Sequence, residues 1–267
     1  MSLSSGKADR TVAVSQKKYL VWNLELKSQC PVKTAAIDSY RHSALLEGER
    51  NMDKAIKQQV RDLLSRRKVN ELLDLCEKDR RFWSAVRLFL YETDDSICWS
   101  AIEVTAELMK RWWKAGREEK VREYIRSLMW LLSDESGGIG WSAPQTIAEI
   151  IVAIPELLEP YSIMAIARAL EEPPLVKSGL WAMGHLGKRI SESVGLVEDM
   201  ISDVFISDEP ETLGLAAWAM GEVGFAPALP FLEALKDRQE PVRIYIDGDF
   251  HEKLLGLWAK EAIDKIE

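Results

Sequence analysis

Histidine and cysteine, the residues that most often bind metal ions or act in catalysis, are scarce in this sequence. There are three of each among 267 residues. His42, His185 and His251 are too far apart to share a helix, so the sequence offers no ligand set for zinc or iron. An odd number of cysteines without a Cys-x-x-Cys pair indicates neither a disulfide framework nor a cysteine zinc site. We therefore expect no metal, no other cofactor, and buried or unreactive thiols.

Long apolar runs and catalytic loops are also missing. No stretch reaches the roughly 18 apolar residues of a membrane span, and the N-terminus lacks the apolar core of a secretory signal, so we expect a cytoplasmic protein without a membrane segment. There is no Gly-x-Ser-x-Gly element for a nucleophile. The glycine-rich residues 136–140 lack the Lys-Ser/Thr of a phosphate loop, and Asp134 and Glu135 beside them would repel an anion. We interpret them as a turn between helices, and the sequence disfavours an enzyme.

Charge is distributed unevenly along the chain, whose net charge is −8. Residues 1–130 contain 25 Lys and Arg against 19 Asp and Glu, whereas residues 131–267 contain 10 against 24. An acidic surface repels phosphate, so the C-terminal half disfavours nucleic acid and favours a basic partner. Most of these charges are expected simply to face solvent.

One segment of the sequence is repeated almost unchanged. Residues 181–187, Trp-Ala-Met-Gly-His-Leu-Gly, recur 37 residues later as Trp-Ala-Met-Gly-Glu-Val-Gly at 218–224. Trp99, Trp141 and Trp258 extend the series, and the intervals between successive tryptophans are 42, 40, 37 and 40. A period near 40 residues is typical of arrays in which each unit is a pair of helices.

The residues between these tryptophans have helical periodicity. Residues 147–154 and 176–190 place apolar side chains at the i, i+4, i+7 spacing of one helix face, and prolines separate the segments. This pattern predicts an all-α fold, a right-handed α-α superhelix of the HEAT or armadillo type, with about five helix pairs in residues 52–267. Gly184 and Gly221 each weaken a helix by roughly 1 kcal/mol, which a close crossing with the next helix would offset.

The repeat resembles a known family. Residues 174–177, Pro-Leu-Val-Lys, followed by the segment 181–187, are similar to the HEAT-like repeat of phycocyanobilin lyases, and residues 136–141 resemble an element of small bacterial HEAT-repeat proteins of uncharacterised function. The last unit begins in the same way at Pro241, but about ten residues around 247–250 intervene before its final helix. We expect a turn or short hairpin there. The resemblance concerns the fold and implies little about activity.

The first 51 residues do not share this pattern. Residues 20–26 alternate in polarity like a strand, but nothing nearby would pair with it. We expect residues 1–51 to be an extension that is poorly ordered or not part of the native chain. The hypothesis is that Met52 is the natural start, because residues 47–50 can be encoded by a purine-rich run of the kind that recruits bacterial ribosomes.

The repeat predicts a stripe of aromatic and polar side chains on the second helix of each unit, which lines the concave side in such solenoids. A helical residue lies beside the one four positions earlier. The predicted pairs are Trp99 with Glu103, Trp141 with Gln145, Trp181 with His185, and Trp218 with Glu222, with Glu107 and Glu149 one turn further along. Either these tryptophans lock one repeat to the next, or an indole beside a carboxylate receives an Arg or Lys side chain of a partner.

The favoured hypothesis is a non-catalytic scaffold that binds a basic protein or peptide on this acidic, tryptophan-bearing face. One alternative is an enzyme similar in architecture to the HEAT-like DNA-alkylpurine glycosylases, which place tryptophans and an acidic residue in a concave groove. That class needs a basic groove, whereas cations here concentrate in residues 54–126. A role like that of a bilin lyase is a third possibility, suggested by the repeat alone. Trp112 and Trp113, flanked by basic residues, form a separate candidate contact surface in which one indole is buried and the other partly exposed.

Overall fold

The computed structural model describes residues 54–132 and 140–267. The chain divides into two units, and these residues all belong to the second, residues 51–267. Three features predicted from the sequence lie outside the described residues. They are the strand around residues 20–26, the proposed start at Met52 and most of the glycine-rich turn at 136–140.

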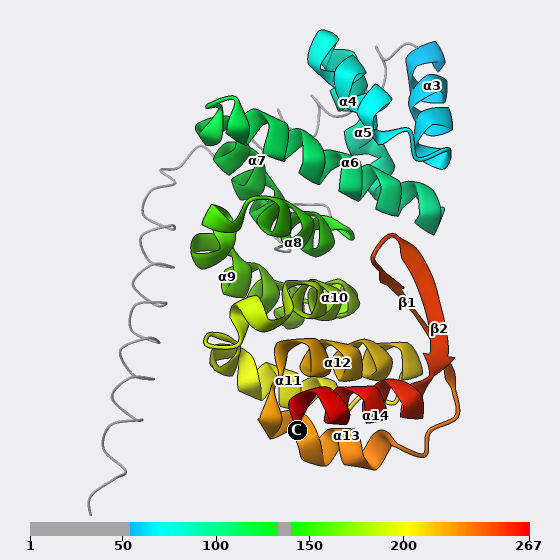
Figure 1. Ribbon diagram of the computed structural model, residues 1–267, viewed down its shortest axis with the longest axis vertical. Coiled ribbons are helices and arrows are strands. Elements are labelled where there is room, and N and C mark those ends of the chain that lie inside the picture. Colours follow the sequence, from blue (N-terminus) through cyan, green and yellow to red (C-terminus); the bar gives the residue numbers. More distant parts are fainter. Residues whose placement is uncertain (1–53, 133–139) are drawn as a thin grey trace, which may run out of the picture. The chain divides into compact units, whose positions relative to one another are not determined.

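The described part of the chain is a mainly helical solenoid in which helices stack in two layers (Figure 1). The tryptophan layer consists of α6 (Asp95–Lys114), α8 (Ala143–Ala153), α10 (Val176–Leu186), α12 (Pro210–Val223) and α14 (Leu255–Ile266). Each helix of this layer packs against the next one in the series. The second layer consists of α7 (Glu118–Trp130), α9 (Leu158–Glu171), α11 (Glu198–Val204) and α13 (Leu229–Leu235). The predicted stack of helix pairs is confirmed.

Three further helices close the N-terminal end of this stack. They are α3 (Lys54–Ser65), α4 (Val69–Lys78) and α5 (Arg80–Leu88), which pack on one another and on α6. Side-chain caps define two of the helix starts. Asp79 accepts a hydrogen bond from the Arg81 backbone amide at the start of α5, and Asp94 accepts from the Ser96 and Ile97 amides at the start of α6. Such caps satisfy amides that have no partner within the helix.

Short 3-10 helices and prolines form many of the turns between the layers. The 3-10 helices are η1 (Phe89–Tyr91), η3 (Pro155–Leu157), η4 (Pro173–Leu175), η5 (Gly187–Ile190), η6 (Val194–Val197) and η7 (Ala226–Ala228). Pro210 opens α12, a position where the missing amide proton costs no helical hydrogen bond. Gly224, at a φ of 76°, ends the same helix in the left-handed conformation that glycine adopts readily.

Gly184 and Gly221 lie at two close helix crossings. A Cβ at Gly184 would lie 2.5 Å from the Trp218 ring, and a Cβ at Gly221 would lie 2.7 Å from the Ala262 backbone. The missing side chains therefore let α10 approach α12, and α12 approach α14, as the sequence predicted.

A β-hairpin interrupts the helical pattern before α14. Strands β1 (Pro241–Ile246) and β2 (Asp249–Leu254) pair antiparallel, with Ile246 opposite Asp249. The two turn residues, Asp247 and Gly248, have φ of 51° and 88°, the positive values of a type I′ turn, whose twist suits a hairpin. The expected turn or short hairpin is confirmed. The hairpin spans residues 241–254 and is therefore longer than the roughly ten residues expected to be inserted. Its first strand, β1, packs against α12.

Candidate functional site

Three tryptophans of the repeat meet in the tryptophan layer. The Trp99 and Trp181 ring centroids are 4.5 Å apart, and those of Trp181 and Trp218 are 6.4 Å apart. His185 stacks on Trp181 at 4.6 Å, as its position one helical turn later predicts. Trp181 and Trp218 are only 3% and 5% exposed, so their rings pack from repeat to repeat and a partner would not touch them. Trp99 is half-buried.

The hairpin lies against this cluster. The Tyr245 ring stacks on Trp99 with centroids 4.2 Å apart and planes 11° from parallel. The Trp181 indole N–H donates to the Tyr245 carbonyl at 2.6 Å, and the Trp258 indole N–H donates to the Val242 carbonyl at 3.2 Å. These bonds satisfy buried indole donors and fix β1 to the tryptophan layer.

Glu103 is joined to the hairpin and to the turn before α4. The Tyr245 hydroxyl donates to Glu103 Oε1 at 2.5 Å and accepts a hydrogen bond from Arg67 Nη2. Arg67 Nη2 is also 3.8 Å from Glu103 Oε1, and its guanidinium lies 5.9 Å from the Tyr245 ring centroid. Burial raises the pKa of Tyr245, and the hydrogen bond to Glu103 raises it further, so the phenol keeps the proton that it donates.

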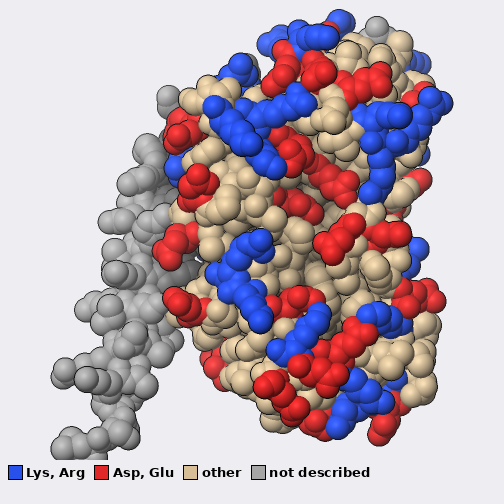
Figure 2. Space-filling model, in the orientation of Figure 1, with Lys and Arg blue, Asp and Glu red and all other residues tan. Residues whose placement is uncertain are grey.

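An open pocket of about 360 Å³ adjoins this contact, between α6 and α8. It is lined by Val69, Glu103, Ala106, Glu107, Lys110, Glu149, Val152 and Ala153. Three carboxylates therefore surround it, with one amine, which pairs with Glu107 at 3.0 Å. Figure 2 shows acidic atoms gathered over α6 and α8 in this region. Apolar side chains form the remaining wall, an environment that strengthens interactions with a bound charge.

Glu149 connects the pocket to the tryptophan cluster. Its Oε2 lies 3.3 Å from His185 Nε2, although the geometry is not that of a hydrogen bond. Gln145, one turn earlier on α8, has a buried Oε1 for which the described residues provide no hydrogen-bond partner. The predicted neighbours Glu103, Glu149 and His185 thus lie along one connected surface.

Two predicted site residues stand apart from this surface. Trp141 lies in the turn before α8, is 57% exposed, and offers its carbonyl to the Ser178 hydroxyl at 2.7 Å. Glu222 accepts a hydrogen bond from Lys265 on α14 at 2.5 Å and does not line the pocket. The helical i+4 relation was wrong for Trp141, which precedes the first residue of α8, and for Glu222 it did not decide whether the side chain belongs to the same site.

Sequence reasoning missed Tyr245 and Arg67. Tyr245 is 142 residues from Glu103 and 178 residues from Arg67, and neither stands at a repeated position. The alternation of polarity in β1 was the available signal for the hairpin, but nothing local to Arg67 indicated its partners.

In the separate pair Trp112 and Trp113, one indole is buried and the other is partly exposed, as predicted. Trp112 is buried and packs edge-on against Trp83 at 5.8 Å, whereas Trp113 is half-buried. Lys120 Nζ lies 3.4 Å from the centroid of the Trp112 ring, and the Arg122 guanidinium 5.0 Å from that of Trp113. Both cations shield the apolar rings from solvent by cation–π contact.

The described residues contain no group of three or more histidine, cysteine or acidic side chains arranged to hold a metal ion. Burial raises the pKa of Cys76 to about 12 and that of Cys98 to about 11, so both thiols stay protonated and unreactive near neutral pH. Within residues 54–132 and 140–267, every helix is too short or too polar to cross a membrane.

The sequence and the structure were compared with those of known proteins. No protein-family model matches the sequence, and no curated protein shows significant similarity to it. Among solved structures, an archaeal HEAT-like repeats protein from Thermococcus onnurineus NA1 is similar, with 14% identity and a TM-score of 0.30 over 79% of this chain and 96% of that one. A likeness of this strength is too weak to transfer properties. The assignment of a solenoid therefore rests on the packing of successive helices described above.

Proposed function

We propose that this protein is a non-catalytic scaffold that binds a basic protein or peptide at the pocket between α6 and α8. The observation that supports this most directly is the ring of three carboxylates, Glu103, Glu107 and Glu149, around an open pocket of about 360 Å³. Pockets of this size hold small ligands or single side chains. A partner's Lys or Arg side chain would supply the opposite charge.

The chemistry of the lining favours a cation with an apolar stem. Lys and Arg bury their methylene groups along apolar walls while the charged end seeks carboxylates, and Val152 and Ala153 provide such a wall. Lys110 offsets only part of the acidic charge, because it pairs with Glu107. Glu103 lies 3.8 Å from Arg67, and Glu149 also lines the pocket that an incoming cation would enter. The acidic balance of residues 131–267 would assist the approach of a basic partner.

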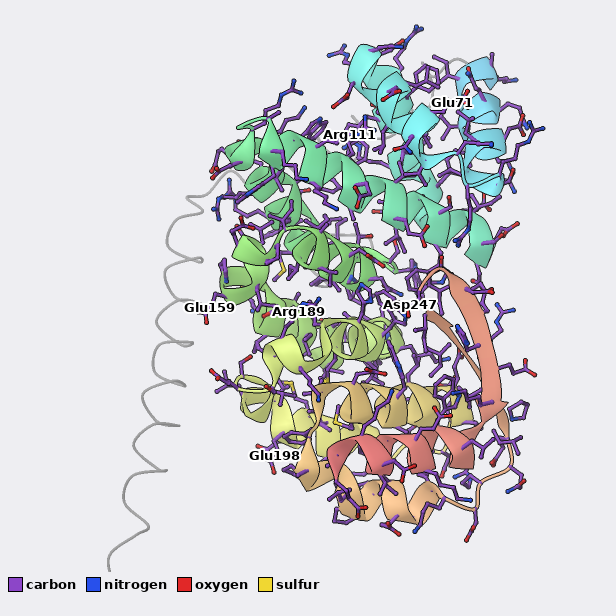
Figure 3. The ribbon with its side chains drawn as sticks, viewed as in Figure 1. Glu71, Arg111, Glu159, Arg189, Glu198 and Asp247 are labelled. Carbon is purple, nitrogen blue, oxygen red and sulfur yellow. The ribbon has the colours of Figure 1, made fainter. Side chains whose placement is uncertain are left out.

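A fluorescently labelled peptide of alternating Arg and Ala tests this proposal by polarisation at low salt. We expect Glu149→Gln and Glu107→Gln each to weaken binding about tenfold, since a charge-assisted hydrogen bond contributes on the order of 1.5 to 3 kcal/mol. The matched control is Glu159→Gln, an equal loss of charge on α9, on the side of the molecule opposite the hairpin (Figure 3).

Two results would contradict the proposal. The first is an equal loss of affinity in Glu159→Gln, which would mean that overall charge and not the pocket governs binding. The second is the absence of binding both by the unaltered protein and by a variant in which Arg67, which lies 3.8 Å from Glu103, is replaced by Gln. The nucleic-acid alternative is tested with a salt-dependent gel shift on duplex DNA, where a shift at low salt would favour it.

A further inference from the structure

Arg67 occupies the position in which a basic partner would be recognised. It is an exposed turn residue between α3 and α4, yet its guanidinium reaches the Tyr245 hydroxyl and lies 3.8 Å from Glu103 Oε1. It also faces the Tyr245 ring at 5.9 Å. Carboxylate, phenol and aromatic ring together are the environment that proteins use to recognise arginine.

The geometry of this contact favours a guanidinium over an ammonium. The planar group of arginine presents several N–H donors in fixed directions and stacks on aromatic rings, whereas lysine offers a compact, strongly hydrated charge. Tyr245 is itself held by stacking on Trp99 and by its hydrogen bond to Glu103. The acceptors are therefore positioned before any external side chain arrives.

The exposure of Arg67 indicates that its side chain is displaceable. The side chain is 44% exposed, so solvent would accommodate the released guanidinium. The backbone φ of 52° is in the left-handed region that is unfavourable for residues other than glycine, a strain of the turn that does not depend on where the side chain lies. Val69, two residues later, lines the pocket, so the turn that carries Arg67 also borders the path of an entering side chain.

We propose that Arg67 is an internal occupant of an arginine-binding site formed by Glu103 and Tyr245, and that an arginine of the partner enters from the pocket and displaces it. This inference rests on the proposed function and specifies its ligand: the recognised group is a guanidinium, and the free protein is held in a self-occupied state. The apparent affinity for the partner equals the intrinsic affinity multiplied by the fraction of molecules in which Arg67 has left the site.

The test compares three variants with the same Arg-Ala peptide. Arg67→Gln keeps a polar but shorter side chain and removes the charge, whereas Arg67→Gly removes the side chain and relieves the strained φ. Equal effects of the two variants would show that the lost guanidinium, and not a disturbed turn, changes the affinity. We expect both to bind the peptide about tenfold more tightly than the unaltered protein. Arg66→Gln, an equal charge change at the neighbouring exposed residue, is the matched control and should leave affinity unchanged.

The recognised group is tested with substituted peptides. Citrulline in place of arginine keeps the shape and removes the charge, and it should abolish the gain in affinity, while a lysine peptide should show a smaller gain. Glu103→Gln added to Arg67→Gln should also remove the gain, because it removes the carboxylate partner.

The outcomes separate this inference from the proposed function. If the unaltered protein binds the peptide and neither Arg67 variant binds more tightly, self-occupancy is wrong while the pocket proposal stands. If Arg66→Gln increases the affinity for the peptide by the same factor, the increase is a general effect of charge and the inference is wrong. If neither the unaltered protein nor the Arg67 variants bind, both proposals fail.

Discussion

At the scale of single residues, a glycine sets the distance between two helices of the tryptophan layer. Gly184 faces the Trp218 ring so closely that even one methyl group would overlap it. Trp218 is buried and Trp181 lies against it, so the indole has little room to move. The same feature explains why this small residue recurs at the same position of the repeat, at Gly221 against Ala262.

We expect Gly184→Ala to destabilise the protein despite the higher helix propensity of alanine. Propensity would add roughly 1 kcal/mol of stability, whereas overpacking a filled core costs roughly 1 to 3 kcal/mol, so the overlap dominates. Urea unfolding followed by tryptophan fluorescence measures the difference. Gly195→Ala is the control, because a Cβ there meets nothing within 4 Å. Equal stability of the Gly184 variant and the unaltered protein would mean that α10 and α12 separate at little cost.

At the scale of elements, a lysine joins two successive helices of the tryptophan layer. Lys177 on α10 donates to Glu209, the cap residue before α12, and to Glu211 on α12 at 2.6 Å. The hydrogen bond from Lys177 lowers the pKa of Glu209 below its usual 4.5, and a second one from Thr212 acts in the same direction. The unfolded chain therefore binds a proton to Glu209 at a higher pH than the folded chain does.

This contact predicts a pH dependence with a definite sign. A carboxylate whose pKa is lowered by folding stabilises the protein above its unfolded value, near pH 4.5, and that stabilisation is lost as the pH falls through the lower folded value. Lys177→Met removes the ammonium, so the melting temperature of this variant should decline less steeply than that of the unaltered protein as the pH falls below 4.5. Parallel curves for the two proteins would show that the contact, which is partly exposed, contributes nothing measurable.

At the scale of the whole described unit, the hairpin joins elements that are distant in the sequence. Besides the contacts of Tyr245, Arg243 on β1 pairs with Asp95 on α6 at 2.7 Å, and the two are 148 residues apart. In a repeat protein each unit usually contacts only its neighbours, so stability is nearly a sum of local terms. The hairpin belongs to the last unit and contacts α6, so it adds a non-local contribution to the free energy of unfolding. The stability of the last unit is therefore coupled to that of α6.

Hydrogen exchange should reveal this coupling. We expect Tyr245→Ala to lower the protection of amides in α3 and α6 as well as in the hairpin, although the substitution lies in the last repeat. The packing of α8 on α10 does not involve Tyr245, so α8 serves as the internal reference. A loss of protection confined to β1 and β2 would mean that the hairpin rests on α6 without stabilising it. Tyr245→Phe, which keeps the ring, separates stacking from the hydrogen bond to Glu103.

The amino-acid sequence alone determined the helix pairs, the stacking of Trp181 on His185, the close crossings at Gly184 and Gly221, and the turn at Asp247 and Gly248. Each depends on interactions within one helix, within one turn, or between units that repeat the same residues, so local periodicity carries the information. Only the tertiary structure decided that Trp181 and Trp218 are buried, that Trp141 and Glu222 stand apart, and that Arg67 meets Glu103 through Tyr245. The contact of Arg67 depends on a hairpin that lies against α6, whereas the other outcomes depend on how successive helices pack and on where each turn begins. Contacts between residues so far apart in the sequence produce no periodic pattern in it.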